Sequence, residues 1–466
     1  MKKTFLFLIL IIASVSLFIG YKLGVYAQIQ SSLKTVLEPG SLATEASYIV
    51  FTDGSLYYVR NGTTGEVEFQ GTDATQAIQY AINASPTGHV HIKEGTYRLS
   101  NPLTLLNNKR YLITGSGYGT YLVTSGAGIF DIADSGSYPF WASQITIENL
   151  RIEAKTGFGI KCEYPNAYGE KCPWLVLRNM YIYAKYGIKL NTPYRSRIEN
   201  VHVQCDNEVS GGIGIWLYQD VPWFHSGDSF FTSIYINMDG PNAIGLLIDA
   251  SKVPDGTINL ITFDKVMAYG HEDSIGIYLK ANNASAGNIA DIHFEAVDLE
   301  GWGTAFKIEG APPPNVRGDI YAIHIQGEYW GATTCLNISG AVSADAHDIE
   351  FACENDIDTS RMYGTLNLYN CFKWGGWNVN LNENTHFYQC RSYTTENEGT
   401  ASINAGETSV TIAHGLPETP KKITLTPVTS TGGRVLWVSE KNSTHFKVSI
   451  DSTYTSQIRF EWYAEI

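Results

Sequence analysis

The 466-residue chain has little charge and no excess of basic residues. Asp, Glu, Lys and Arg together make up 17% of it, and 46 acidic against 32 basic residues give a formal net charge of −14. A protein with this balance repels polyanions, so the sequence argues against nucleic acid or an anionic membrane surface as a partner. A bare polyanionic substrate is disfavoured for the same reason, unless cations bridge the two.

Cysteine is also scarce, and its seven copies form no metal-binding pattern. The sequence has no CxxC pair and no Cys/His cluster, so it predicts no metal site. Cys162 and Cys172 could close a loop between them. The odd count leaves at least one thiol free, and the connectivity stays open. Four cysteines recur at near-constant intervals and some of them could pair: Cys335, Cys353, Cys371 and Cys390.

Most of the chain lacks the 3.6-residue apolar period of helices and carries a longer repeat instead. Between Phe158 and Leu368 a short phrase recurs eight times: a small residue, an apolar residue, any residue and another apolar residue. Its first apolar residues stand at positions 160, 188, 215, 246, 277, 306, 336 and 366, which gives steps of 28, 27, 31, 31, 29, 30 and 30. A second alternating strand precedes most copies.

Alternating strands that recur at a long interval predict coils stacked in a solenoid, in which each coil buries its apolar face only against its neighbours. Leucine-rich repeats have a shorter period and a Leu/Asn consensus that is missing here. Helical repeats of similar length would need the absent 3.6-residue period. The sequence therefore predicts an all-β fold, a parallel β-helix.

A targeting segment is predicted at the N-terminus, in residues 1–27. Lys2 and Lys3 precede an apolar run, and Ala27 ends a small-residue motif that suits cleavage. We predict a signal peptide, with a membrane anchor whose tether is residues 4–20 as the alternative. Both alternatives place the rest of the chain outside the cytoplasm, in the extracellular space or at the cell surface.

Four further segments follow. Residues 28–47 read as a linker, residues 48–72 as an N-terminal β segment, residues 73–398 as the parallel β-helix and residues 399–466 as a small antiparallel β-sandwich. An amphipathic helix that begins after Asp73 is expected to cap the first coil, whose backbone would otherwise be unpaired. The C-terminal sandwich could cap the last coil, assemble a homotrimer or bind sugar.

The start of the repeat resembles that of pectate-lyase-like right-handed parallel β-helix proteins, a superfamily that includes rhamnogalacturonases, epimerases and tailspikes. The likeness lies in the run from Thr72 to Asn83, in Gly95-Thr96-Tyr97 and in Gly115-Ser116-Gly117. It implies a right-handed β-helix with an N-terminal capping helix. Lyases, hydrolases, epimerases and phage tailspikes all share this segment, so the resemblance implies no single activity.

Three carboxylates are the candidate catalytic residues. Residues at equal register in a β-helix stack about 4.8 Å apart, and aligning the strands before each phrase places Asp298, Glu300 and Glu328 on one outward face. Glycoside hydrolases use two carboxyl groups, about 5–5.5 Å apart in retaining enzymes and about 6.5–9.5 Å apart in inverting ones. Crowding also raises one carboxyl pKa, as an acid catalyst requires. For each residue, an ordinary solvated face is the alternative.

The same alignment predicts substrate-binding residues beside these carboxylates. Aromatic side chains can stack on sugar rings, and polar ones can bind hydroxyl groups. The predicted set is Tyr235, Asn237, Asp239, Tyr269, His271, Trp302 and Trp330.

The chain departs from the family's best-known enzymes. Polygalacturonases carry adjacent aspartates with a downstream Gly-His-Gly and an Arg-x-Lys, and no such set is present. No recognisable arginine motif of the calcium-dependent lyases is present either. We predict no cofactor; Ca²⁺ would be expected only if the protein were a lyase. We predict an extracellular protein that binds and cleaves polysaccharide, as a hydrolase rather than a lyase. The alternatives are a non-catalytic cell-surface or tailspike-like adhesin and a structural cell-envelope component.

Overall fold

The computed structural model describes residues 46–85, 88–133, 144–163, 174–220, 225–252, 256–283, 286–312, 319–373 and 375–466. The predicted targeting segment with its tether, all of the linker but its last two residues, and Cys172 lie outside the described residues. In the described part of the chain, no helix combines the length and the apolar content needed to cross a membrane.

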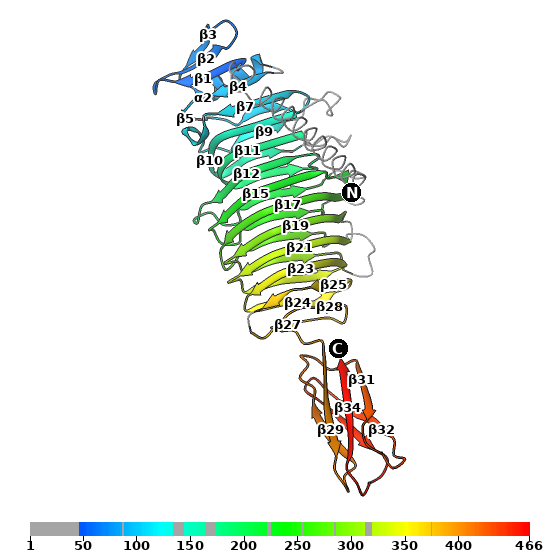
Figure 1. Ribbon diagram of the computed structural model, residues 1–466. Coiled ribbons are helices and arrows are strands. Elements are labelled where there is room, and N and C mark those ends of the chain that lie inside the picture. Colours follow the sequence, from blue (N-terminus) through cyan, green and yellow to red (C-terminus); the bar gives the residue numbers. More distant parts are fainter. Residues whose placement is uncertain are drawn as a thin grey trace, which may run out of the picture.

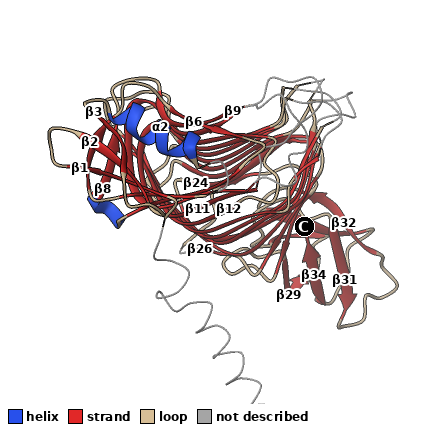
Figure 2. Ribbon diagram, turned by 90° about the horizontal axis from the view of Figure 1, so that it is seen from above, coloured by secondary structure: helices blue, strands red, loops and turns tan. Residues whose placement is uncertain are grey.

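A short β segment and one helix close the first end of the molecule. Strands β1 (Tyr48–Thr52), β2 (Tyr57–Asn61) and β3 (Val67–Gly71) pair antiparallel. The helix α2 (Ala74–Ala84) begins at Asp73, whose side chain accepts hydrogen bonds from the backbone N–H groups of the next turn. Its apolar face is buried, and Figure 2 shows α2 lying across the strands of the first coils. The predicted capping helix is confirmed.

Parallel strands stacked coil upon coil form the rod in Figure 1. After the early strands β4 (His89–Ile92), β5 (Gly95–Arg98), β6 (Leu103–Leu106), β7 (Arg110–Gly115), β8 (Thr120–Val123) and β9 (Gly128–Ala133) come two long ones, β10 (Gln144–Cys162) and β11 (Trp174–Asn191). One later series consists of β12 (Arg197–Cys205), β15 (Ser229–Met238), β17 (Thr257–Gly270), β19 (Asn288–Glu300), β21 (Ile320–Trp330) and β23 (Val342–Ala352). The other consists of β13 (Ile213–Tyr218), β16 (Ile244–Asp249), β18 (Ile275–Lys280), β20 (Thr304–Glu309), β22 (Thr334–Gly340) and β24 (Asn355–Met362).

The first two copies of the repeated phrase form the ends of β10 and β11, and the later copies build the second of these series, with one exception. Its first seven apolar positions stack in register from Ile160 in β10 to Leu336 in β22. The next residue in that column is Ile357 of β24. The eighth copy instead forms β25 (Thr365–Tyr369), which pairs with β23 on the other wall. The last coils are therefore shorter. The eighth copy of the phrase follows the seventh at the usual interval, so its change of wall could not be recognised from the spacing.

The core runs the length of the rod, and aromatic rings stack inside it. The rings of Phe231 and Phe263 lie 4.6 Å apart and those of Phe263 and Phe294 lie 5.0 Å apart, centroid to centroid. Cys335 and Cys353 form a disulfide between neighbouring coils. Of the evenly spaced cysteines, these two pair as the sequence suggested some would.

A residue at a left-handed backbone angle forms a corner in each of the strands β10, β11, β12, β15, β17 and β19, and β17 and β19 carry a second such residue nearer their start. Asn149, Asn179 and Asn200 hold this corner in β10, β11 and β12, with φ values of 59°, 52° and 51°. Asn is among the few residues that tolerate this conformation. The Asn179 amide donates to Asn149 at 3.0 Å, and the Asn200 amide donates to Asn179 at 2.8 Å. We call the outer surface before this corner the groove face and the surface after it the carboxylate face.

The C-terminal part is built from two small antiparallel sheets. One contains β29 (Glu396–Ile403), β34 (Ile458–Glu465) and β31 (Lys422–Pro427); the other contains β30 (Ser409–Ala413), β33 (His445–Ile450) and β32 (Leu436–Lys441). They enclose their own core around Phe446, Phe460 and Trp462. The predicted fold class, a right-handed parallel β-helix with a capping helix and a C-terminal sandwich, is confirmed. The predicted border after Glu398 falls inside β29, because its pairing with β34 already begins at Glu396.

Trp302 is a core residue, and its predicted role in substrate binding was wrong. Strand β19 ends at Glu300, and Gly301 has a φ of 73°, which breaks the alternation of inward and outward side chains. The indole is consequently fully buried, and its Nε1–H donates to the carbonyl oxygen of Ala268 at 2.9 Å. Its six-membered ring lies against Gly270, where a Cβ atom would come within 2.2 Å of the ring.

We therefore expect Gly270→Ala to destabilise the rod by about 1–3 kcal/mol, because the packed indole leaves no room for a methyl group. Chemical denaturation monitored by tryptophan fluorescence measures the shift in midpoint. Gly376→Ala is the control, since no atom lies within 4 Å of the added Cβ. Equal midpoints for the two variants would contradict this packing.

Candidate active site

The three predicted catalytic residues share the carboxylate face. Strand pairing sets Asp298 of β19 opposite Glu328 of β21, and Glu300 opposite Trp330. Asp298 and Glu300 are half-buried, whereas Glu328 is exposed. The columns inferred from sequence are thus correct for these residues, although register alone assigns them no role.

The Asp298 carboxyl group is held in a setting that disfavours its charge. Burial, followed by the nearby Glu300 and Glu328 side chains, raises the pKa of Asp298 to about 6. Its Oδ1 atom is buried and has no hydrogen-bond partner among the described residues. An ionised carboxylate would be poorly compensated at this position, so the neutral acid is favoured.

Aromatic rings lead along the same face toward these carboxyl groups. The rings of Tyr181 and His202 lie 4.7 Å apart, those of His202 and Tyr235 4.3 Å, and those of Tyr235 and Tyr269 5.5 Å. Tyr269 is the neighbour of Glu300 in the strand register. The rings and the carboxyl groups therefore form one continuous outward strip, which we call the aromatic strip.

The other predicted binding residues occupy different positions. Asn237 lies in the strip, half-buried between Gln204 and Tyr269 in register. Trp330 is exposed beside Glu300. Asp239 and His271 lie just after their strands, outside the paired register. There the backbone N–H of Asp273 donates to His271 Nδ1 at 3.3 Å, which is a local turn contact.

Sequence analysis missed one further carboxyl group in the column. Glu350 of β23 is the register partner of Glu328. The signal was present, because Ile349-Glu350-Phe351 alternates just as Val297-Asp298-Leu299 does. The alignment stopped one coil too early.

A cavity lies on the groove face, away from the carboxyl groups. It has a volume of about 730 Å³ and crosses β10, β11, β12, β15, β17 and β19. Its lining combines three arginines, two aromatic rings and acidic residues, among them Arg178, Arg195, Arg197, Trp174, Phe230, Asp228 and Asp291. A polymer can bind along an open strip without a cavity, so the two faces are separate candidate sites.

The arginines of the groove differ in their partners. Arg178 lies between Glu199, at 2.9 Å, and Glu148, at 3.6 Å. Arg195 contacts Asp228 at 3.7 Å. Arg197 lies over the Phe230 ring, 6.0 Å from its centroid, and makes no ion pair within the described ranges. The groove therefore offers an uncompensated cation beside aromatic surface on an otherwise acidic protein.

Comparison with known proteins gives likeness of architecture only. No protein-family model and no curated protein sequence matches the chain. A tailspike of Pseudomonas phage phi297 is 12% identical, covering 84% of this chain and 91% of the tailspike, with a TM-score of 0.43. The A-module of a mannuronan C-5 epimerase of Azotobacter vinelandii is 13% identical, covering 68% and 94%, with a TM-score of 0.39.

The catalytic unit of a GH87 α-1,3-glucanase from Streptomyces thermodiastaticus is also similar. It is 13% identical, with 69% of this chain and 66% of the glucanase covered and a TM-score of 0.38. Such low identities and TM-scores carry no argument about activity. The function must be argued from the residues of this chain.

The raised pKa of Asp298 predicts a pH-dependent effect of Asp298→Asn on stability. The folded-state pKa lies above the unfolded value of 3.8, so the stability that the neutral acid contributes is full below pH 3.8 and is lost as the pH rises through about 6. Asparagine cannot ionise. At pH 8 the free energy of unfolding of the variant should therefore exceed that of the wild type by about 1 kcal/mol, after allowance for solvent screening, whereas at pH 3.5 it should not.

Urea unfolding midpoints at the two pH values measure this difference. Glu295→Gln, an exposed change on the same strand, is the matched control and should show no such dependence. A gap between wild type and Asp298→Asn that is the same at both pH values would rule out the strained carboxyl group.

Proposed function

We propose that this chain is an extracellular polysaccharide-active protein that hydrolyses a glycosidic bond on its carboxylate face. The observation that carries the proposal is Asp298: a carboxyl group with a buried, unpartnered oxygen and a pKa of about 6, beside two other carboxyl groups. A general acid that must hold its proton near neutral pH needs this kind of environment.

The chemistry follows the two-carboxyl scheme. Asp298 donates its proton to the glycosidic oxygen as the bond to the anomeric carbon breaks. In an inverting reaction a neighbouring carboxylate removes a proton from the attacking water, and in a retaining reaction that carboxylate attacks the carbon and water later releases the sugar. Either route consumes one water and leaves one new reducing end.

Strand geometry provides a partner for each route. The backbone of Glu328 lies on the adjacent strand, about 4.8 Å away along the rod, and this spacing suits the carboxyl separation of a retaining enzyme. The backbone of Glu300 lies two residues along the same strand, about 6.6 Å away, and this spacing suits the carboxyl separation of an inverting enzyme. The anomeric configuration of the first product identifies the partner used.

The aromatic strip supplies the binding surface. Tyr235 and Tyr269 present ring surface along the rod axis, and Asn237 presents an amide between coils. Sugar rings stack on aromatic faces, and amides bind hydroxyl groups. A glycan lying along these columns would bring a linkage to Asp298.

We expect Asp298→Asn to lower kcat by about 10²–10⁴-fold, because it removes the transferable proton. Wild-type activity should fall as the pH rises above about 6, where Asp298 loses its proton. Neutral and acidic polysaccharides are assayed for new reducing ends and, to detect a lyase, for the ultraviolet absorbance of unsaturated products. Glu295→Gln is the control and should retain full activity.

If none of the polysaccharides in the panel is cleaved, the result would count against a hydrolase. Activity that survives both Asp298→Asn and Glu328→Gln would show that the chemistry lies elsewhere.

The groove face supports a second candidate, a non-catalytic glycan-binding protein. Its 730 Å³ cavity is lined by Arg197, which makes no ion pair with any residue the structure describes, by Phe230 beside it and by Trp174. Arginine binds carboxylate and sulfate groups, and the rings can pack on sugar. This candidate therefore predicts preference for an acidic oligosaccharide.

On this second candidate, Arg197→Ala should weaken binding of an acidic oligosaccharide by about tenfold, because a charge-assisted hydrogen bond is lost. Calorimetry on an Asp298→Asn background measures binding without turnover. Arg361→Ala is the control, since Arg361 is exposed on β24, on a different wall. If Arg197→Ala binds as tightly as the control, the groove does not hold the ligand.

A further inference from the structure

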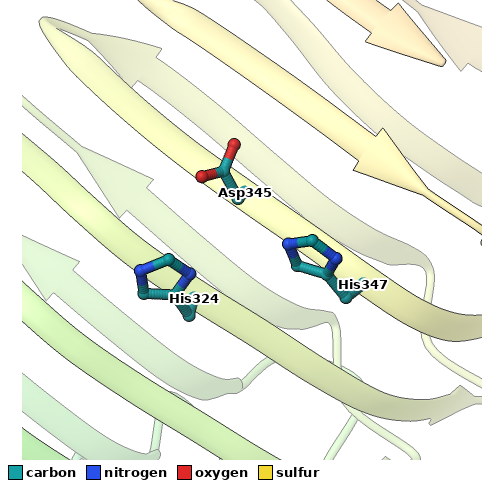
Figure 3. Close-up of side chains that lie close together, drawn as sticks. All are labelled: His324, Asp345 and His347. Atoms are coloured by element: carbon teal, nitrogen blue, oxygen red, sulfur yellow. The ribbon is translucent and has the colours of Figure 1, made fainter. Parts of the chain in front are cut away.

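Three side chains with metal-binding atoms converge on the groove face, beyond the cavity. They are His324 of β21 and Asp345 and His347 of β23, drawn in Figure 3. One donor atom from each lies within 4.8 Å of the other two, and all three side chains are half-buried. None belongs to the carboxylate face, and none lines the 730 Å³ cavity.

Strand pairing brings the three together. His324 and Asp345 are direct register partners in neighbouring coils, so their Cα atoms sit about 4.8 Å apart. Asp345 and His347 are two residues apart on one strand, so both point outward from the same surface. Two coils and one face are enough to assemble the set.

Neighbouring residues hold each of the three side chains in place. The His293 ring stacks on His324, with centroids 4.6 Å apart, and the Tyr369 ring stacks on His347 at 4.7 Å. The Asn367 amide donates to Asp345 Oδ1 at 2.9 Å. Partners of this kind orient the ligands of a metal site and reduce the ordering that binding requires.

We propose that His324, Asp345 and His347 bind one divalent transition-metal ion of the zinc type. Two imidazole nitrogens and one carboxylate oxygen form a donor set that zinc accepts with a further position open to water. Ca²⁺ would need six to eight oxygen donors, so the two imidazoles disfavour it. Zinc bonds of about 2.0–2.1 Å place tetrahedral donors about 3.3 Å from one another, so the three side chains close in on the ion when it binds.

The bound ion would connect β21 to β23 and so stabilise the late coils. Any ligand that binds only the folded state raises its stability by mass action. The site lies on the opposite side of the strand corner from Asp298. The zinc proposal is therefore independent of the proposed hydrolase activity.

The test is titration of the tag-free full-length chain with ZnCl₂ by isothermal calorimetry. We expect one tight equivalent, with affinity lowered by at least about tenfold in His324→Asn and in His347→Asn. His386→Asn is the matched control, because His386 is half-buried in the same column two coils further on. It should bind as the wild type does.

Two further measurements keep the outcome decisive. Asn367→Ala should weaken zinc by about tenfold with unchanged stoichiometry, because the carboxylate loses its orienting partner. Zinc should raise the melting temperature of the wild type and of His386→Asn but not of His324→Asn, which separates lost binding from altered folding. The proposal would be overturned if the wild type bound no zinc ion tightly. It would also be overturned if the His324→Asn/His347→Asn double variant still bound one zinc ion as tightly as the wild type.

Discussion

The outward surface of the rod depends on a bend within each of the strands β10, β11, β12, β15, β17 and β19. The bend is held at left-handed φ by Asn149, Asn179 and Asn200, and then by residues such as Ser233 and Lys265. In the first coils the asparagine amides also hydrogen-bond from one coil to the next. Because parallel pairing continues in register on both sides, the bend sorts outward side chains into two separate faces.

The two faces differ in chemistry. The carboxylate face gathers acids at the end of an aromatic strip, where burial and mutual repulsion raise the pKa of Asp298. The groove face gathers arginines in its earlier coils and imidazoles in its later ones, from Arg197 to His293 and His324. Both faces use the same strands. A solenoid can thus carry separate sites on one set of coils, because the residues of one outward column can differ without changing those of the next column.

Asp298 also illustrates how a stable scaffold can hold an unfavourable group. Its side chain costs stability whenever it ionises, yet the strands around it are anchored by the stacked rings of Phe263 and Phe294. Strain of this kind persists where the surrounding packing over-determines the position. The same rigid register would keep a proton donor in place during a reaction.

Much of the fold could be predicted because its signals are local. Alternation and the recurring phrase specify strands and coils, and Asp73 with its apolar helix specifies the cap. Register between like-patterned strands also gave the correct columns for Asp298, Glu300 and Glu328. The alignment failed where one residue changes the alternation, as Gly301 does before Trp302, and where the coil length changes, as it does before β25.

By itself, the sequence determined the β-helix, its capping helix and the carboxyl column, since period and alternation are properties of neighbouring residues. Only the tertiary structure decided that Trp302 is internal, that arginines line a cavity across six strands and that His324 meets His347. The physical reason is that these outcomes depend on φ at single positions and on contacts between coils. Neither the φ angle at one residue nor a contact between coils can be read from the pattern of apolar residues along the sequence.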